Sequence, residues 1–329
     1  MEELRWGIIG PGSIARDFAD DLKLANGKQK VTSVLSHHPE SANEFAEEYH
    51  IGSVHTKLSE FIKQKNFDVV YIATPHPLHY EEAKACLLNG IPVLCEKPMV
   101  INSQQAKELV DISRSKNTFL LEGMWIRFLP SITKVLAIVD SGEIGKIISV
   151  KASMSFLAPK DPSSRYFDPE LGGGSLLDLG VYPVFLSHLL LGKPSSVSAV
   201  AKLSEKGIDE YCAAILSFPE DRFAIIESSI ISKTELIAEI AGEYGTIKIS
   251  EPWNEKPAGI VLIRPEKEKT EFPCNWKGKG FQFEAEEVMK CLRNNTIESS
   301  LHPQQLTLDI VTTMDEIRKQ TGVRYHSFE

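Results

Sequence analysis

The stretch of sequence that decides the fold is residues 4–15, which read LRWGIIGPGSIA. Residues 4–9 are mainly apolar and have the length of a buried strand, and the Gly-Pro-Gly that follows ends it. A helical pattern then runs from Ser13 to Leu24. A strand, a glycine turn and a helix in this order predict the first unit of a parallel sheet covered by helices.

The alternation of strands and helices continues through the first third of the chain. Apolar runs at residues 31–35, 67–73, 91–95 and 118–122 predict further strands, with helical stretches between them. The run FDVVYIA at 67–73 is almost entirely apolar, which a parallel strand buried on both faces requires. We therefore predict a doubly wound parallel sheet, a Rossmann domain, over residues 1–122.

Beyond residue 122 the pattern changes to a run of strands, from Ser196 to about Phe272. It predicts a large, mainly antiparallel open sheet, so residues 123–329 are expected to form an α+β domain for substrate binding and dimerisation. A loop is predicted at 157–174, and a helix at 175–191 that Gly180 and Pro183 weaken. We expect a last helix at about 303–319 to pack back on the Rossmann domain.

One face of the predicted antiparallel sheet needs a cover other than helices. The strands at 211–218 and 223–231 carry apolar residues on both alternations, so an uncovered face would expose a large apolar patch. We therefore predict a homodimer packed through this sheet.

Composition excludes several classes of protein. The chain has 36 Lys and Arg against 45 Asp and Glu, a net charge of −9, which disfavours binding to nucleic acid or to an anionic membrane. The apolar stretch at 181–191 is too short to span a bilayer. The five cysteines form no C-x-x-C pair, and His76 and His79 lack further ligands nearby, so no metal site is predicted. We predict a soluble cytoplasmic protein.

The glycine turn fits the pattern G-x-G-x-x-A, with Gly10, Gly12 and Ala15 at the defining positions. Such glycines let backbone N–H groups, here those of Ser13 and Ile14, approach a pyrophosphate at the positive end of a helix. The alternative is a tight turn that requires glycine for its geometry alone. The strand before and the helix after the turn favour a dinucleotide site.

The residue types at the end of the second predicted strand indicate which dinucleotide binds. An NAD site has Asp or Glu there to bond the ribose 2′-hydroxyl, whereas this chain has Ser36, His37 and His38. Neutral or cationic donors suit a 2′-phosphate, so NADP(H) is favoured. NAD(H) stays possible because no Arg is present, and the histidines could simply be exposed on a loop.

Two further motifs follow predicted strands directly. Thr74, Pro75 and His79 come after the third strand, and Glu96 and Lys97 after the fourth. The carboxyl ends of parallel strands form the ligand-binding edge of such a sheet. We therefore expect these residues at the cofactor site, with Lys97 near the nicotinamide end or the substrate. A surface ion pair is the alternative for Glu96 and Lys97.

These motifs, in this order and spacing, resemble the Gfo/Idh/MocA oxidoreductases over essentially the whole chain. The resemblance extends to residues 122–128, EGMWIRF, and to 172–182, GGGSLLDLGVY. Both segments are similar to the branch of dimeric dihydrodiol dehydrogenases, also called NADP-dependent D-xylose 1-dehydrogenases. Many sugar and inositol dehydrogenases of the family have His at the position of Tyr182 and Asp three residues later, where this chain has Phe185.

The resemblance implies that Tyr182 is the catalytic acid or base and that Lys97 is its neighbour. Oxidation of a secondary alcohol needs a base for the hydroxyl proton, and free tyrosine has a pKa of about 10. A cation must therefore stabilise the phenolate, and Lys97 is the expected one. Asp178, four residues before Tyr182, could hold a substrate hydroxyl or orient Lys97, or it could be only a helix-start carboxylate.

Four residues are expected to shape the substrate pocket. Trp125 and Phe156 would supply an apolar wall, Arg165 a loop over the pocket, and Arg127 a polar group on the crossover segment. Aromatic residues at such positions are as often part of the core.

Together these features predict an NADP(H)-dependent dehydrogenase acting on CH–OH groups of a sugar or a cyclic trans-diol. One alternative is an NAD-dependent inositol or other polyol dehydrogenase. The other is a non-catalytic regulator that senses cofactor or sugar, which the presence of both Lys97 and Tyr182 disfavours.

Overall fold

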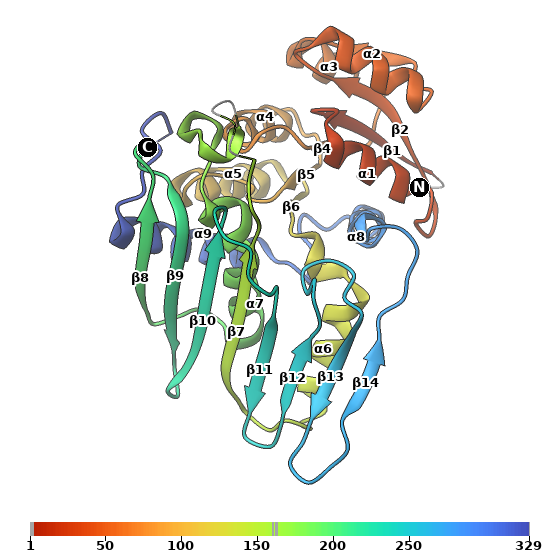
Figure 1. The fold of residues 1–329 in the computed structure, drawn as a ribbon. Coiled ribbons are helices and arrows are strands. Elements are labelled where there is room, and N and C mark those ends of the chain that lie inside the picture. Colours follow the sequence, from red (N-terminus) through yellow and green to blue (C-terminus); the bar gives the residue numbers. More distant parts are fainter. Residues whose placement is uncertain (1–2, 160, 162–163, 329) are drawn as a thin grey trace. The chain divides into compact units, whose positions relative to one another are not determined.

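The computed structural model describes residues 3–159, 161 and 164–328 (Figure 1). The chain divides into two compact units, each built around one sheet. The first unit contains the chain up to Val100, Gln104–Phe128 and Trp276–Thr307, and the second contains Ile101–Ser103, Leu129–Asn275 and the chain from Leu308 onward. The first unit thus includes residues 123–128 and 276–307 in addition to the predicted Rossmann segment, from which only Ile101–Ser103 are assigned to the second unit.

The first unit contains the predicted doubly wound parallel sheet, with strand order β3-β2-β1-β4-β5-β6. The residues of its central strands β4 and β5 are all buried, as expected for strands with helices on both faces. The short edge strand β3 was not predicted, because three residues carry no readable periodicity. The strands are β1 (Glu3–Ile9), β2 (Lys28–Leu35), β3 (Ser53–His55), β4 (Val69–Ile72), β5 (Val93–Glu96) and β6 (Leu120–Gly123).

Six helices and one 3₁₀ turn accompany this sheet: α1 (Ser13–Leu22), α2 (Pro39–Glu48), α3 (Leu58–Gln64), α4 (His76–Leu88), α5 (Ser103–Lys116), η1 (Trp125–Phe128) and α8 (Phe281–Arg293). Helix α8 lacks a side-chain cap of its own. Instead Asp21 of α1 accepts hydrogen bonds from the backbone N–H groups of Lys279, Gly280 and Phe281, at 2.9, 2.7 and 3.0 Å. Asp21 therefore fixes α8 to the Rossmann sheet although 260 residues separate them.

The second unit contains the predicted large open sheet, with strand order β14-β13-β12-β11-β7-β10-β9-β8. Neighbouring strands are antiparallel except for the parallel pair β7 and β10, which confirms a mainly antiparallel sheet. The strands are β7 (Ile147–Ser155), β8 (Ser196–Leu203), β9 (Asp209–Phe218), β10 (Arg222–Ser229), β11 (Ala238–Gly242), β12 (Thr246–Ile249), β13 (Gly259–Ile263) and β14 (Thr270–Pro273).

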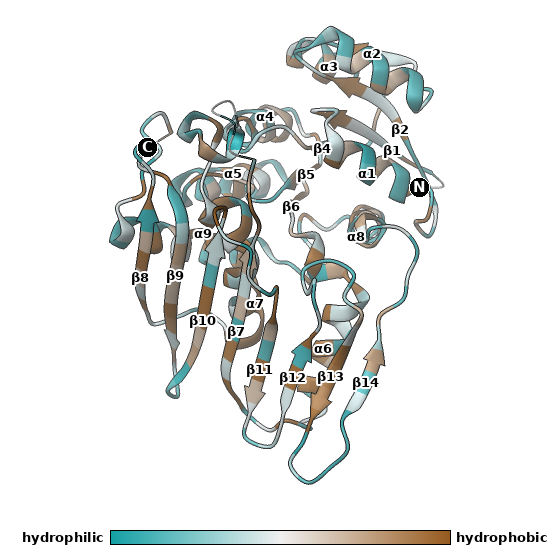
Figure 2. Cartoon of the chain, in the orientation of Figure 1, coloured by the Kyte–Doolittle hydropathy of each residue, from teal (hydrophilic) through white to brown (hydrophobic). Residues whose placement is uncertain are grey.

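The two faces of this sheet differ in their cover. Helices α6 (Pro130–Asp140) and α7 (Val181–Leu191) pack on the inner face. Along each strand, every second side chain points to the opposite, outer face. This face exposes apolar side chains, among them Ile215, which is 49% exposed, and Ile225, which is 39% exposed. Brown, hydrophobic segments run along β10 and β13 (Figure 2). One row of paired residues on the inner face is completely buried: Leu216, Ala224, Val150, Ile240, Ile247 and Leu262.

The helix predicted at 175–191 forms in two parts. Residues Leu176–Gly180 are a π-helical turn, and α7 continues from Val181. A Cβ on Gly180 would lie 2.9 Å from Leu176 Cδ1 and 3.1 Å from Ser228 Oγ, so glycine is needed for this close approach to β10. The predicted loop before it contains two short 3₁₀ turns, η2 (Arg165–Phe167) and η3 (Pro169–Leu171), and residues 160, 162 and 163 lie outside the described residues.

The chain ends in α9 (Gln304–Thr321), the helix predicted at about 303–319. Its first turn belongs to the first unit and the remainder to the second. Within the second unit, His188 Nε2 of α7 lies 2.9 Å from Thr313 Oγ1 of α9. His188 is therefore buried between two helices, as expected for a core histidine.

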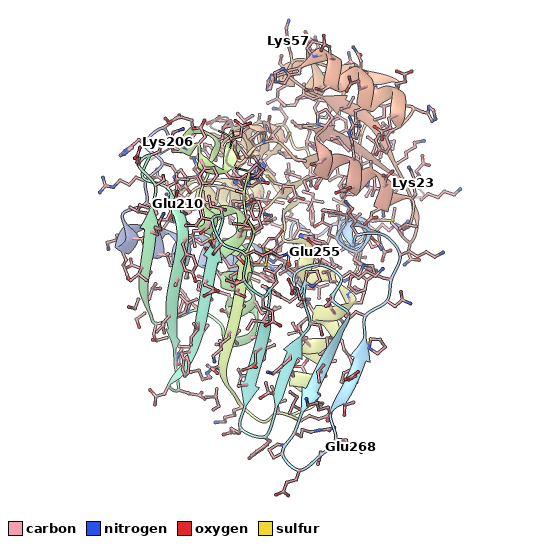
Figure 3. All side chains as sticks on the ribbon, in the orientation of Figure 1. Lys23, Lys57, Lys206, Glu210, Glu255 and Glu268 are labelled. Atoms are coloured by element: carbon pink, nitrogen blue, oxygen red, sulfur yellow. The ribbon has the colours of Figure 1, made fainter. Side chains whose placement is uncertain are left out.

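One apolar stretch, Pro169–Leu191, has the length and composition of a membrane span, but 83% of its apolar 18-residue window is buried inside the protein. Such burial is typical of the core helix of a globular protein, so the stretch is weak evidence for a membrane. Charged side chains such as Lys23, Lys57 and Glu268 project from the surface (Figure 3).

Candidate functional site

A cavity of about 320 Å³ opens at the carboxyl edge of the Rossmann sheet. It lies beside β1 and β4, where the strand order changes direction, and this is the position at which doubly wound sheets bind ligands. The cavity brings together residues that follow three different strands. The predicted residues that line it are Gly10, Gly12, Ser36, His37, Thr74 and Pro75.

The two glycines of the turn have different physical roles. Gly10 has φ +85°, and a Cβ there would lie 2.7 Å from Thr74 Cγ2, so the fold itself requires glycine. Gly12 is the N-cap of α1 with φ −81°, and a Cβ there would meet nothing within 4 Å. That empty cradle at the start of a helix, beside the first-turn residues Ser13 and Ile14, fits the pyrophosphate of a dinucleotide.

The end of β2 presents the predicted polar residues to the same cavity. Ser36 is buried, its backbone N–H bonds to the His55 carbonyl, and its hydroxyl oxygen accepts the His38 N–H at 3.1 Å. This bond fixes the backbone of the turn and leaves His37 exposed at the cavity. No carboxylate follows β2 at this point, as the sequence indicated.

The floor of the cavity contains a carboxyl group that the motifs did not reveal. Thr74 Oγ1 donates a hydrogen bond of 2.6 Å to Glu82 Oε2, and Glu82 is 5% exposed. Burial raises the pKa of Glu82 to about 7, although the bond from Thr74 opposes this. Glu82 therefore fixes the Thr74 side chain at the ligand edge.

His79 does not line this cavity and is completely buried. Its Nδ1 is 3.0 Å from the Pro98 carbonyl oxygen, and its Nε2 is 2.7 Å from the Thr74 carbonyl oxygen. Burial lowers the pKa of His79, while the two carbonyl contacts oppose that effect. His79 thus ties the loop after β4 to the loop after β5.

The loop after β5 carries the predicted Glu96 and Lys97. Glu96 is buried, and it accepts a hydrogen bond of 2.5 Å from Tyr71 Oη and one of 3.2 Å from the Lys97 backbone N–H. Burial raises the pKa of Glu96 to about 7, against the lowering effects of Tyr71 and Lys97. Lys97 itself is half-buried at the end of the strand. Glu96 therefore holds the backbone of Lys97 from a buried position, and the two residues are not a surface ion pair.

A second buried carboxylate, Glu122 of β6, holds the same loop. It accepts the Met99 N–H at 3.0 Å and the Thr307 hydroxyl at 2.9 Å, and His302 Nε2 lies 3.4 Å away. Burial would raise the pKa of Glu122, but its contacts with His302, Met99 and Thr307 together lower it. The loop that presents Lys97 is thus held by three buried groups: Glu96, His79 and Glu122.

Two of the residues expected at the substrate pocket pack within the first unit. Trp125 stacks on Phe281 with ring centroids 5.1 Å apart, and both are largely buried. Arg127 is 8% exposed and donates through Nε to the Leu301 carbonyl at 2.7 Å. Both side chains are anchored to α8 and the segment that follows it.

The other two pocket residues, Arg165 and Phe156, both contact Tyr166 in the second unit. Arg165 Nη2 lies 3.3 Å from Asp178 Oδ2, and the Arg165 guanidinium lies over the Tyr166 ring. Phe156 packs edge-on against Tyr166, with centroids 4.9 Å apart. The predicted residues Asp178, Arg165 and Phe156 therefore belong to one contiguous cluster.

Tyr182 lies in the first turn of α7 and is 6% exposed. The segment that positions it is held by Asp209 of β9, which is completely buried. Asp209 Oδ2 accepts hydrogen bonds of 2.7 Å from both the Ser175 hydroxyl and the Leu176 N–H. Burial raises the pKa of Asp209 to about 6, while bonds from Ser175 and Leu176 oppose this.

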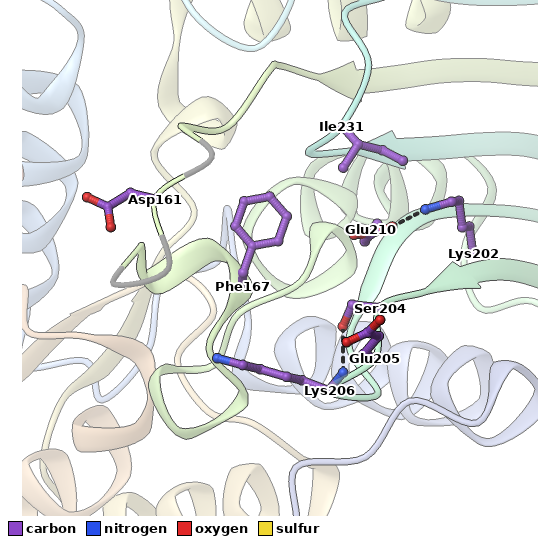
Figure 4. Close-up of a pocket in the computed structure, with 8 residues that line it drawn as sticks. All are labelled: Asp161, Phe167, Lys202, Ser204, Glu205, Lys206, Glu210 and Ile231. Atoms are coloured by element: carbon purple, nitrogen blue, oxygen red, sulfur yellow. Dashed lines mark hydrogen bonds and ion pairs between the residues drawn. The ribbon is translucent and has the colours of Figure 1, made fainter.

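A second cavity of about 660 Å³ lies in the second unit near the β8–β9 turn. Figure 4 shows Phe167 facing it, with the Lys202–Glu210 ion pair and Lys206 beside Ser204. None of the predicted site residues lines this cavity. Within the described residues, no group of three or more His, Cys, Asp or Glu side chains could hold a metal ion.

Comparison with known proteins gives a consistent result. The oxidoreductase family with an NAD-binding Rossmann fold, Gfo/Idh/MocA, matches residues 4–124, and the Gfo/Idh/MocA C-terminal domain matches 132–248. The trans-1,2-dihydrobenzene-1,2-diol dehydrogenase of Mus musculus is 33% identical over 98% of each chain. The chain therefore belongs to the Gfo/Idh/MocA oxidoreductase family, as the motifs indicated.

Two solved structures share the fold over nearly the whole chain. An aldose-aldose oxidoreductase from Caulobacter crescentus has a TM-score of 0.88 at 20% identity, covering 97% of this chain and 98% of its own. A variant of a 3-ketoreductase from Actinomadura kijaniata, in complex with TDP-benzene and NADP, has a TM-score of 0.85 at 23% identity, with the same coverage. At these identities the likeness establishes the fold.

Proposed function

We propose that this protein is an NADP(H)-dependent dehydrogenase that acts on a secondary alcohol or hemiacetal carbon of a sugar or a cyclic trans-diol. The observation that carries the proposal is the edge of the Rossmann sheet. There the empty cradle at Gly12 and the half-buried Lys97 stand at the ends of β1 and β5, on either side of β4. The 33% identity to a dihydrodiol dehydrogenase over 98% of the chain supports the substrate class.

Tyr182 is proposed as the acid or base and Lys97 as the cation that stabilises its phenolate. When bound, a nicotinamide cofactor supplies the acceptor or donor of hydride. Tyr182 takes the hydroxyl proton during oxidation and returns it during reduction. The three buried groups behind Lys97 support its role, because they fix the backbone that carries the ammonium group.

Asp178 and Arg165 are proposed to bind the substrate hydroxyl groups as a unit. A carboxylate accepts hydrogen bonds from hydroxyl groups, and a guanidinium donates them. Their ion pair at 3.3 Å, with Asp178 8% exposed and Arg165 exposed, supports this division of roles. Trp125, Arg127 and Phe156 are proposed to complete the pocket.

The preference for NADP(H) over NAD(H) is proposed from the turn after β2. Exposed His37 and buried Ser36 can donate hydrogen bonds to a 2′-phosphate. The residues after β2 that line the cavity include no carboxylate, which would repel that phosphate.

The function is tested with purified protein, NADP⁺ and a panel of pentoses, hexoses, inositols and cyclic diols, by the absorbance of the reduced nicotinamide. We expect turnover with at least one sugar or diol. Tight cofactor binding without turnover of any compound would favour a sensor over an enzyme.

We also propose a cytoplasmic homodimer that packs through the outer face of the second sheet. Val200, Ile215 and Ile225 are 71%, 49% and 39% exposed on neighbouring strands, a patch typical of an interface.

Light scattering tests the dimer. Ile215→Lys should convert the dimer to a monomer, whereas Leu88→Lys, at a similarly exposed site on α4, should leave the dimer intact. A monomeric wild type at micromolar concentration would refute the dimer.

The proposed cytoplasmic location rests on the cysteines. All five are free, which agrees with a reducing compartment.

A further inference from the structure

The cavity of about 660 Å³ in the second unit has no role in the function proposed above. Its volume lies within the range of small-molecule sites, about 300–1,000 Å³. Two of its lining residues, Phe167 and Ile231, are apolar and half-buried, and the Phe167 ring faces the cavity (Figure 4). The cavity therefore offers an apolar wall with an aromatic ring.

Two walls of this cavity continue directly into the proposed substrate residues. Phe167 follows Tyr166 in η2, and the Tyr166 ring contacts both Arg165 and Phe156. Ile231 forms a β-bridge with the residue that follows Phe156. Because consecutive Cα atoms are only about 3.8 Å apart, the cavity and the substrate cluster share these backbone segments.

A third wall connects the cavity to the segment that carries Asp178 and Tyr182. Glu210 of β9 lines the cavity, and its side chain is 17% exposed. The residue before it, Asp209, accepts the Leu176 N–H at 2.7 Å and so holds the π-helical turn that contains Asp178. All of these residues belong to the second unit, so the cavity lies next to the proposed substrate site within one compact unit.

The turn between β8 and β9 forms the polar side of the cavity, and hydrogen bonds fix its backbone. The Ser204 carbonyl accepts the Gly207 N–H at 3.0 Å, and the Ser204 hydroxyl oxygen accepts the Lys206 N–H at 3.2 Å. Beside the turn, Lys202 pairs with Glu210 (Figure 4). A fixed polar side next to an apolar wall suits a ligand whose hydroxyl groups donate and accept hydrogen bonds around an apolar ring face.

The charges along the cavity disfavour an anionic ligand. Among the described residues that line it, three carboxylates face two ammonium groups: Asp161, Glu205 and Glu210 against Lys202 and Lys206. Because carboxylates are in excess, a phosphate or diphosphate would be placed among like charges. A neutral ligand rich in hydroxyl groups can bond to both kinds of side chain without that cost.

We propose that this cavity is a distal subsite that binds a second, neutral sugar unit of the substrate. The C–H face of that ring packs on Phe167, and its hydroxyl groups bond to the polar turn. The unit that is oxidised lies at Asp178 and Arg165. The substrate is then a disaccharide or a glycoside instead of a monosaccharide or a cyclic diol. This inference rests on the proposed function and narrows its substrate class.

The first test measures binding without turnover. The protein is saturated with the reduced cofactor, which cannot accept hydride from an alcohol, and is titrated by calorimetry with cellobiose, maltose, lactose and xylobiose. Their constituents glucose, galactose and xylose are titrated in parallel. We expect at least one disaccharide to bind roughly tenfold more tightly than its monosaccharides, since the second ring buries further apolar surface. Equal affinity of every disaccharide and its monosaccharides would overturn the subsite.

Phe167→Ala tests where the second ring binds. This variant should lose the advantage of the disaccharide over the monosaccharide, because the apolar face is gone. Tyr244→Ala is the matched control, since Tyr244 is an exposed aromatic residue of the same unit and is not among the lining residues of the cavity. It should keep the wild-type ratio of affinities. A ratio that survives in Phe167→Ala, or that falls equally in Tyr244→Ala, would overturn the position of the subsite.

Glu205→Lys tests the preference for a neutral ligand. The disaccharide that binds best is compared with its 6′-phosphate. The wild type should bind the phosphate roughly three- to tenfold more weakly at low salt, and Glu205→Lys, at an exposed position of the turn, should reduce this difference. Tighter binding of the phosphate than of the disaccharide by the wild type would overturn the neutral character of the subsite.

Turnover separates this inference from the proposed function. With the oxidised cofactor, kcat/KM should be higher for the disaccharide than for its monosaccharides, and in Phe167→Ala this ratio should fall mainly through KM. Turnover of monosaccharides and disaccharides at equal kcat/KM would reject the subsite and leave the proposed function standing. Disaccharide binding that depends on Phe167, without turnover of any sugar, would reject the proposed function and support a saccharide site in the cavity.

Discussion

The cofactor edge of the first unit and the Tyr182 region of the second are assembled in different ways. At the cofactor edge, Gly10, Thr74 and Lys97 each follow their own strand within two residues, so parallel pairing alone aligns them. In the second unit, Asp178 meets Arg165 across 13 residues of loop, and Asp209 anchors the segment from 33 residues further on. A site on strand ends is thus set by local pattern, whereas a site on a loop and a π-turn depends on distant partners.

The largest expected effect concerns the proposed proton transfer. Tyr182→Phe removes only a hydroxyl group, so cofactor binding should survive while turnover falls about 10²–10⁴-fold. Steady-state kinetics and fluorescence titration of NADP⁺ measure the two quantities. Near wild-type turnover would show that another group takes the proton.

The dependence on distant partners predicts a large stability effect at Asp209. Asp209→Ala leaves the Leu176 N–H without its acceptor, at about 1–3 kcal/mol, whereas the Ser175 hydroxyl can still donate to the Ser228 carbonyl at 3.1 Å. Because folding raises the pKa of Asp209, the wild type loses stability as pH rises through about 6, so its advantage should narrow from pH 5 to pH 8. Chemical denaturation at the two pH values measures this, and a widening advantage would contradict it.

The two glycines of the cofactor edge should separate folding from binding. Gly12→Ala has room for its Cβ, so stability should be unchanged while NADP⁺ affinity falls at least about tenfold, because the methyl group fills the cradle. Gly10→Ala places a side chain at φ +85° against Thr74 and should lose about 1–2 kcal/mol of stability or more. Wild-type affinity in a folded Gly12→Ala variant would contradict the position of the pyrophosphate.

The smallest expected effect is the cofactor preference. His37→Asp should shift the NADP(H)-to-NAD(H) affinity ratio about tenfold toward NAD(H), since a carboxylate bonds the ribose 2′-hydroxyl and repels a 2′-phosphate. His50→Asp, an exposed residue outside the cavity, is the control. Equal affinity of the wild type for both cofactors would contradict the proposed preference for NADP(H).

The features that the sequence predicts are those set by local pattern, and the features that it does not predict depend on distant partners. Helix α1 begins at the predicted Ser13, and α9 covers nearly all of the predicted residues 303–319, because the patterns that predict them are local. The cavity at the cofactor edge is lined by part of the residues that the strand-end motifs singled out, namely Gly10, Gly12, Ser36, His37, Thr74 and Pro75. His79, Glu96 and Lys97 are not among its lining residues.

The groups that hold these residues in place were not predictable. Glu122 bonds to Thr307 across 185 residues, and Glu82 lies on the buried face of a helix where a carboxylate breaks the apolar pattern. Nothing local distinguishes such a buried glutamate from a solvated one, since its environment is created only by tertiary packing. Asp209 likewise resembles an ordinary polar residue next to a turn.

The most direct test of the central claim is a double-mutant cycle between the two regions. Tyr182→Phe, Lys97→Met and the double variant are compared by kcat with NADP⁺ and a substrate from the panel. If Tyr182 and Lys97 form one proton-transfer unit, the double variant should be about as slow as the slower single variant. Losses that multiply, so that the double variant falls by the product of the two single effects, would contradict the account.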